Sequence, residues 1–162
     1  MRPDKADSPT SAHPPTQRYF TVEQAEETLV LVRQITRDLV HDYQELMRLR
    51  ADREEVALTL DEHERLDDLN LEIDAKARRL QSLLDELEDV GCQAKDLVSG
   101  LIDFPALYQG RQVWLCWRLD ETRLEYWHEW DGGFAGRKPI DAAFRHALRQ
   151  GTAIETAAPD VG

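Results

Sequence analysis

The feature that most constrains this chain is a run without glycine or proline, from residue 22 to about residue 55. Apolar residues recur along it in steps of three and four, which places them on one face of an α-helix. They are Ala25, Leu29, Val32, Ile35, Leu39, Tyr43, Leu46 and Leu49. Thr21 and Gln24 fit a capping box at the start of this helix, with Phe20 placed to pack on its first turn. At ~1.5 Å per residue, the run predicts a helix about 50 Å long.

A second helical pattern follows within a few residues and shows a seven-residue repeat. Its apolar positions are Leu66, Leu69, Ile73, Leu80, Leu83, Leu87 and Val90. Lys76 is the one polar residue in that series, and a repeat held this long predicts a coiled-coil neighbour. Thr59 and Glu62 fit a second capping box, and Gly91 supplies a left-handed end. Because the link near residues 56–58 is short, the two helices are expected to pack antiparallel as a hairpin.

Period-two alternation replaces the helical pattern in the last third of the chain, where all four tryptophans lie. A strand is predicted from Arg111, with one apolar face. That face consists of Val113, Leu115, Trp117 and Leu119. Two further strands are predicted, one at residues 100–105 that Pro105 ends, and a short one at the edge at residues 92–95. Asp141 fits the N-cap of a short last helix.

The turn between the two Trp-rich strands is predicted at residues 120–123. If its loop has two residues, Trp117 lies opposite Tyr126 and Leu115 lies opposite His128. A two-stranded hairpin is unstable alone, so its apolar face is expected to pack on the helices. Strands of about seven residues reach only ~23 Å. The distal half of the helical hairpin is therefore expected to extend beyond the sheet, with a second subunit or a partner over its apolar stripe.

These patterns predict an α+β protein: a long antiparallel helical hairpin of coiled-coil type, then a small three- or four-stranded antiparallel sheet and a short C-terminal helix. One domain is expected over residues 18–149, with the hairpin in residues 18–91 and the Trp-rich sheet and short helix in residues 92–149. Residues 1–17 and 150–162 lack an apolar period and are predicted to be a disordered and a frayed tail.

Charge and apolar content argue against two large classes of function. The chain has 32 Asp and Glu against 20 Lys and Arg, a net charge of −12, and residues 21–90 carry −11 of it. Nucleic-acid binding is not expected, because affinity for phosphates rests on clustered Lys and Arg. No apolar run approaches the ~20 residues that span a bilayer, and no apolar stretch follows Met1 as in a secretion signal. Cys92 and Cys116 are too few for a disulfide framework, so a cytoplasmic protein is expected.

Polar side chains with binding chemistry gather in the Trp-rich part. The candidate ligand-binding residues are Asp103, Arg111, Trp117, Arg118, Tyr126, His128, Asp131 and Arg137. The loop at residues 131–137 holds three glycines, which let backbone N–H groups approach a ligand, and Arg137 suits a carboxylate or a phosphate. The alternative interpretation of this loop is a wide connection that needs positive φ.

A metal-site hypothesis involves His128, Asp131 and Asp103, which together suit a divalent ion or a general acid–base pair. One histidine is thin support, since zinc sites normally have three or four protein ligands. Cys116 lies in mid-strand beside two tryptophans, and we interpret it as an inert buried thiol. The sequence indicates no catalytic residue.

Several short segments form a specific combination. They are residues 18–21 (RYFT), 100–107 (GLIDFPAL), Arg111, 115–119 (LCWRL), 126–128 (YWH) and 133–137 (GFAGR). In combination they resemble the DUF2203 family, small prokaryotic proteins of unknown function, over roughly residues 18–141. The resemblance implies a prokaryotic source and helices before strands, and it carries no activity or catalytic residue. It draws attention to Asp103, Trp117, Arg118, His128 and Arg137, which lie within these segments.

The sequence favours a non-enzymatic cytoplasmic interaction or assembly module built on the helical hairpin, acting as a homodimer or with a protein partner. No cofactor is predicted for that role. The alternative is a small-anion or metal-binding protein, with hydrolytic activity as one form of it. It would use Asp103, His128, Asp131 and Arg137, and a divalent metal ion belongs to this alternative alone.

Overall fold

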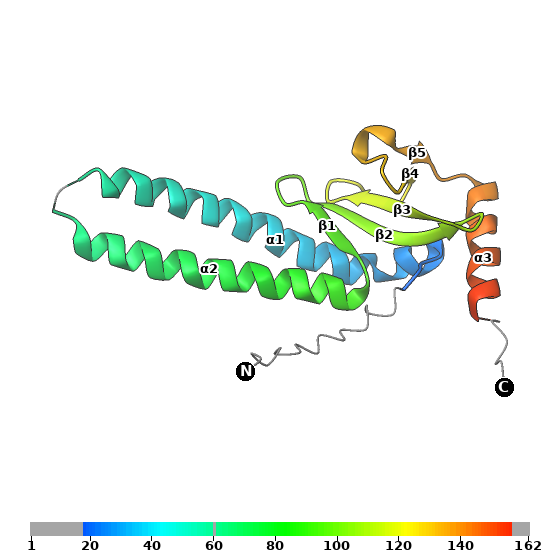
Figure 1. Ribbon diagram of the computed structural model, residues 1–162, viewed down its shortest axis with the longest axis horizontal. Coiled ribbons are helices and arrows are strands. Elements are labelled where there is room, and N and C mark those ends of the chain that lie inside the picture. The colour runs from blue at the N-terminus through cyan, green and yellow to red at the C-terminus, as the bar shows by residue number, and fades with distance from the viewer. Residues whose placement is uncertain (1–17, 60, 157–162) are drawn as a thin grey trace, which may run out of the picture.

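The computed structural model describes residues 18–59 and 61–156, with side chains described as far as residue 150. In chain order its elements are α1 (Val22–Ala57), α2 (His63–Val90), β1 (Gln93–Asp96), β2 (Leu101–Tyr108), β3 (Arg111–Arg118), β4 (Tyr126–Glu129), the 3₁₀ turn η1 (Phe134–Gly136), β5 (Lys138–Pro139) and α3 (Ala142–Thr156). α1 and α2 form a long antiparallel hairpin, the sheet lies over one half of it, and α3 stands at the end of the sheet (Figure 1). The predicted α+β class is confirmed.

The sheet has five strands in the order β1-β2-β3-β4-β5, with every pair antiparallel. This is one more than the largest number predicted, because the two-residue β5 pairs with β4. The tail predicted at residues 1–17 and the last six residues of the tail predicted at residues 150–162 lie outside the described residues. The predicted end of the domain at residue 149 falls inside α3, which continues to Thr156. Within the described ranges, no helix combines the length and apolar character needed to cross a membrane.

Both ends of the hairpin show how local sequence starts and stops its helices. The capping box of α1 is confirmed: Thr21 Oγ1 accepts from the Gln24 amide at 3.1 Å, and Gln24 Oε1 accepts from the Thr21 amide at 3.0 Å. The capping box predicted at Thr59 is wrong, because α2 begins after Glu62 and has no side-chain cap. Thr59 instead belongs to the end of α1, where its amide donates to Val56.

The apolar stripes of α1 and α2 pack on each other along the whole hairpin. Even in the half that extends past the sheet, Leu46, Leu49, Leu69 and Ile73 are only 5–7% exposed. The prediction that this stripe lacks cover within one chain is therefore not supported. The homodimer stays a prediction, but the burial of this stripe within one chain removes the argument that a second subunit must cover it.

An ionic cluster around one buried aspartate lies at the middle of the hairpin. Asp42 of α1 is 5% exposed, and its carboxylate accepts from Lys76 Nζ at 3.3 Å and from Arg79 Nε at 2.6 Å. Burial opposes ionisation of Asp42, but the hydrogen bonds from Arg79, His41 and Lys76 outweigh it and hold its pKa below the usual value. Lys76, the polar exception in the heptad series, thus pairs across the hairpin and favours one register of the helices.

The inner face of the sheet completes the core. Val113, Leu115 and Trp117 are fully buried and join the apolar cluster of α1 and α2, as predicted. The prediction that Pro105 ends its strand is wrong, since β2 continues to Tyr108. The N–H and C=O of one residue point to the same side of a strand, and the Pro105 carbonyl accepts from Phe20 on the side away from β3. The missing N–H of proline therefore costs no bond of the β2–β3 ladder.

The register predicted between β3 and β4 is wrong by one residue. Leu115 lies opposite Trp127, and His128 lies opposite Trp114. The cause is the connection, which runs over residues 119–125 rather than through a two-residue loop. It is held by Glu121, whose side chain accepts from the Arg118 amide at 2.7 Å. A shift of one residue moves each side chain to the other face, so His128 points away from the hairpin.

Candidate functional site

Three adjacent strands bring an aspartate, a cysteine and a histidine together on the outer face of the sheet, away from the hairpin. β2 carries Asp103, β3 carries Cys116 and β4 carries His128. Asp103 lies opposite Cys116, while the neighbouring Phe104 and Leu115 belong to the inner, apolar core. The three side chains are 2%, 0% and 2% exposed. Their ligand-type atoms lie within 4.8 Å of one another.

The imidazole ring of His128 is held at both nitrogens. Nδ1 lies 2.7 Å from the backbone carbonyl oxygen of Glu129. Because a carbonyl oxygen only accepts, Nδ1 carries a proton and donates it. Nε2 lies 3.0 Å from Oδ2 of Asp103, so one proton lies between these two atoms, on the ring or on the carboxyl group. The backbone contact therefore aims Nε2 at the carboxylate.

Burial sets the electrostatics of the cluster. It raises the pKa of Asp103, an effect that the nearby His128 opposes. It also raises the pKa of the Cys116 thiol to about 12, with the charge of Asp103 as the next cause. Such a thiol is protonated near neutral pH and is a poor nucleophile. Oδ1 of Asp103 has no hydrogen-bond partner in the part of the chain that the structure describes.

Aromatic and cationic side chains surround the cluster on the outer face. Trp114 stacks on Trp130, with ring centroids 4.2 Å apart and planes 14° apart. Lys95 Nζ lies 4.4 Å from the Trp114 ring centroid, and the Arg137 guanidinium lies 4.1 Å from that of Tyr126. These contacts hold the segment after β4 against the outer face of the sheet.

With this geometry established, comparison with known proteins places the chain in one family. The family model described as "Uncharacterized conserved protein (DUF2203)" matches residues 18–140. The chain belongs to the DUF2203 family. The matched region of this DUF2203 protein runs from the start of α1 through β5, so it contains both the hairpin and the outer-face cluster. No curated protein and no solved structure matches the chain.

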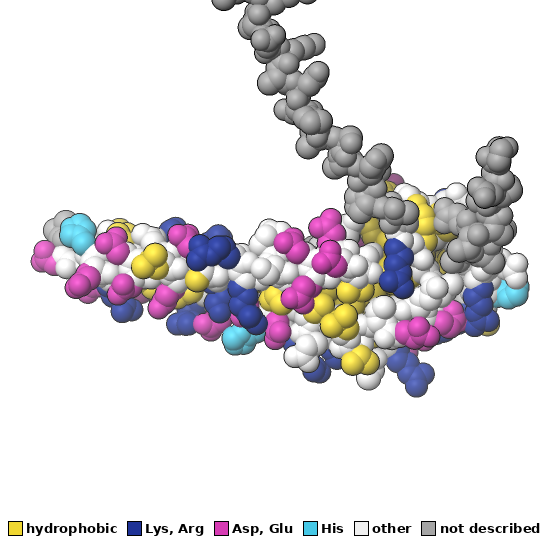
Figure 2. Space-filling view, turned by 90° about the horizontal axis from the view of Figure 1, so that it is seen from below, with side chains coloured by type: hydrophobic (Ala, Val, Ile, Leu, Met, Phe, Trp, Pro, Cys, Tyr) yellow, Lys and Arg dark blue, Asp and Glu magenta, His cyan; other side chains and the backbone are white. Residues whose placement is uncertain are grey.

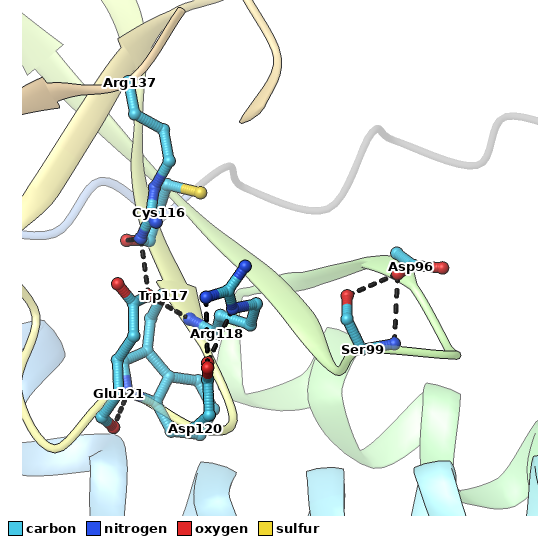
Figure 3. A network of polar contacts seen from close by, with 8 residues as sticks. All are labelled: Asp96, Ser99, Cys116, Trp117, Arg118, Asp120, Glu121 and Arg137. Atoms are coloured by element: carbon cyan, nitrogen blue, oxygen red, sulfur yellow. Dashed lines mark hydrogen bonds and ion pairs between the residues drawn. The ribbon is translucent and has the colours of Figure 1, made fainter. Parts of the chain in front are cut away.

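The three arginines predicted for an anionic ligand each pair with a carboxylate in this DUF2203 protein. Arg137 donates to Glu121 Oε1 at 2.5 Å and to the Cys116 carbonyl oxygen at 3.1 Å (Figure 3). The other pairs, each with two contacts, are Arg118 with Asp120 and Arg111 with Glu129. Nε of Arg137 is buried without a hydrogen-bond partner among the described residues. Because these charges are neutralised locally, the geometry gives little support to the small-anion hypothesis.

The remaining predicted site residues lie in different places. Asp131 is exposed in the turn after β4 and lies outside the buried cluster. Trp117 is buried on the opposite face, where its Nε1 donates to the Glu121 carbonyl oxygen at 3.0 Å. Tyr126 lies on the outer face below Arg137. Of the predicted metal ligands, the structure therefore brings together Asp103 and His128 but not Asp131.

Cys116 is the cluster member that sequence reasoning missed as a ligand. The sequence feature that could have located it is the Gln109–Gly110 pair, which separates two segments predicted as strands. Both residues have positive φ, 51° and 78°, as a type I′ two-residue hairpin loop requires. That loop pairs Tyr108 with Arg111, and the same register sets Asp103 opposite Cys116. A two-residue loop at this site would have predicted the contact.

Proposed function

We propose that this protein is a non-enzymatic interaction module that presents one half of its helical hairpin to a protein partner. The observation that carries the proposal is the extent of residues 42–77, here called the distal arm. Figure 1 shows this half of α1 and α2 extending past the sheet, and none of the described strands, nor α3, lies beside it. The arm adds no cover to the sheet core.

The arm nevertheless has a well-defined conformation. Its apolar stripe is buried between the two helices, and the Asp42 cluster at its base joins them across the hairpin. Ordering a residue costs about 1–2 kcal/mol of backbone conformational entropy. An arm ordered at that cost, and not used to cover the sheet, is suited to binding outside the chain.

Charge complementarity favours a partner with a basic surface. Residues 42–77 hold 12 Asp and Glu against 5 Lys and Arg, a formal charge of −7. Figure 2 shows acidic side chains along the arm, with basic ones among them. A second copy of this chain would bring the same negative charge, which disfavours association through this surface. We therefore propose a basic partner protein, with the homodimer as the competing outcome.

Photocrosslinking from the arm tests this proposal. A photoreactive amino acid replaces Leu71, which is 68% exposed on α2, in the full chain in its own cells. One discrete product with a basic protein is expected, and it should disappear with Asp67→Lys and Asp74→Lys, which flank position 71. The control carries the photoreactive group at Val98, 65% exposed beside the sheet, and should lack that product.

Two results would overturn the proposal. The first is the absence of a discrete product from position 71 while the chain is folded and expressed. The second is a product with twice the mass of the chain, together with a dimer in sedimentation at tens of micromolar, which would establish the homodimer instead. In sedimentation without its partner, the purified chain is expected to be a monomer.

A further inference from the structure

The outer-face cluster has the donor set of a metal site, and this donor set is independent of the distal arm. Asp103, Cys116 and His128 each offer one ligand atom, and these atoms lie within 4.8 Å of one another. Ligands at ~2.0–2.3 Å from a tetrahedral zinc ion lie about 3.3–3.8 Å apart. Oδ2 of Asp103 and Nε2 of His128, at 3.0 Å, are already close to that separation. We propose that Asp103, Cys116 and His128 bind one divalent transition-metal ion of the zinc type.

The orientation of His128 supports this assignment. Histidines that bind a metal through one ring nitrogen usually donate the other N–H to a carbonyl or carboxylate, which fixes the tautomer. Nδ1 of His128 makes this contact with the Glu129 carbonyl oxygen at 2.7 Å. Nε2 therefore faces Asp103 and can bind a metal ion once the proton shared with Oδ2 has left. All three donors lie on paired strands, so the backbone holds their spacing.

An unmatched oxygen supplies a second, independent observation. Oδ1 of Asp103 is buried and accepts no hydrogen bond from the described residues, in a side chain that is 2% exposed. Leaving a buried acceptor without a hydrogen bond destabilises the folded state, and more so when the group is charged. Binding of a cation would release to solvent the thiol proton of Cys116 and the proton shared by Nε2 and Oδ2. The cation, held between the carboxylate, the resulting thiolate and Nε2, would remove that cost.

Charge balance and ligand type select the class of ion. One thiolate and one carboxylate with a neutral imidazole carry two negative charges, so a divalent ion makes the buried group neutral. A buried neutral group avoids the desolvation penalty of an isolated charge. Sulfur and imidazole donors favour Zn²⁺ and its neighbours, whereas Mg²⁺ and Ca²⁺ prefer oxygen alone. Three protein ligands leave the fourth position of a tetrahedral ion to water or another small donor.

Cobalt titration of the purified full chain tests the site. Co²⁺ is added to chelator-treated protein, both in the folded state and during refolding from denaturant, so that burial of the site does not block access. We expect saturation at one equivalent, a sulfur-to-cobalt charge-transfer band, and loss of that band when Zn²⁺ is added. Mg²⁺ should not displace the cobalt.

Matched variants assign the ligands. Cys116→Ser should lose the sulfur band, and His128→Gln and Asp103→Asn should each weaken binding by more than about 100-fold, beyond the effect of removing an outer partner. Cys92→Ala, which alters the other buried cysteine, and Asp131→Asn should both keep the band.

Some outcomes would overturn the metal site. The decisive one is the absence of a sulfur band at one equivalent in wild-type protein that is folded by circular dichroism. A band that survives Cys116→Ser but disappears with Cys92→Ala would assign the metal elsewhere. Neither result depends on whether the distal arm has a partner, so this inference and the proposed function fail separately.

Discussion

At the scale of single residues, Asp42 links stability to pH. Its folded-state pKa lies below the usual value, so its ionised form stabilises the fold. This stabilisation is complete above the unfolded pKa of about 3.9 and is lost as pH falls through the folded pKa. We expect Asp42→Asn to lower the free energy of unfolding by about 1–3 kcal/mol at pH 7, because it leaves Lys76 and Arg79 without their carboxylate.

Urea unfolding of wild type and Asp42→Asn at pH 7 and near pH 3 measures this effect. The gap between the two proteins should shrink on acidification, since the wild-type carboxylate then takes up a proton. Glu45→Gln is the control, because Glu45 is a partly exposed acid whose ion pair among the described residues is with Arg48 of its own helix. A gap that stays constant between the two pH values would show that the charge of Asp42 is not the stabilising feature.

Close packing leaves no room for a side chain at Gly100. Its φ is +75°, and a Cβ there would lie 2.9 Å from both Leu119 Cβ and Thr36 Cγ2. Gly110 has a similar φ of +78° but open space around the same position. Gly110→Ala should therefore lower the free energy of unfolding by about 1 kcal/mol, through left-handed backbone strain alone. Gly100→Ala should lower it by about 1–3 kcal/mol more, because its Cβ would also overpack the core. Equal losses in urea unfolding would contradict the packing argument.

At the scale of elements, the two threonines near the helix starts should differ. Thr21 caps α1 through its hydroxyl group, whereas Thr59 caps no helix. Thr21→Ala should lower the free energy of unfolding by about 0.5–2 kcal/mol, as for other lost caps. Thr59→Ala should change it by less than about 0.5 kcal/mol, the usual limit for surface substitutions. Thermal or urea unfolding measures both changes. A large loss of stability in Thr59→Ala would indicate that Thr59 does cap α2.

Short-range sequence patterns predict the helices and strands of this protein better than they predict how the strands pair. The helices follow from spacing and from Thr21, and the strands follow from alternation. The β3–β4 register was wrong because the connection depends on Glu121, whose side chain bonds the Arg118 amide, a contact that residue type does not show. The prediction for Pro105 is wrong because proline is tolerated where its missing N–H faces away from the paired strand β3, and residue type does not show which way it faces.

The sequence predicts only part of the candidate site, because strand pairing decides which of its residues meet. Residue type alone selects Asp103 and His128, and they meet although the expected register places His128 opposite Leu115. Asp131 has the same residue type, but it follows the end of β4, where the chain leaves the sheet. A thiol in mid-strand gives no ligand signal by residue type, and the neighbours of Cys116 become clear only once the β2–β3 register is known.

At the scale of the whole molecule, the distal arm and the sheet should be separable. Deleting residues 47–53 and 68–74 removes one heptad from each helix and keeps the phase of both apolar stripes. All four tryptophans lie in the sheet part, so their near-UV circular dichroism and fluorescence should not change. The helices hold 36, 28 and 15 residues, so the helical signal should fall by about a sixth.

The same deletion discriminates between the two surfaces of the molecule. Cobalt binding at Asp103, Cys116 and His128 should persist in the shortened chain, because this cluster and the hydrogen bonds of its histidine lie within β2, β3 and β4. Crosslinking to a basic partner should be lost, because position 71 and its acidic neighbours are removed. Loss of the tryptophan signals on shortening would instead show that the sheet needs the arm to fold, and the arm would then have a structural role in place of the proposed one.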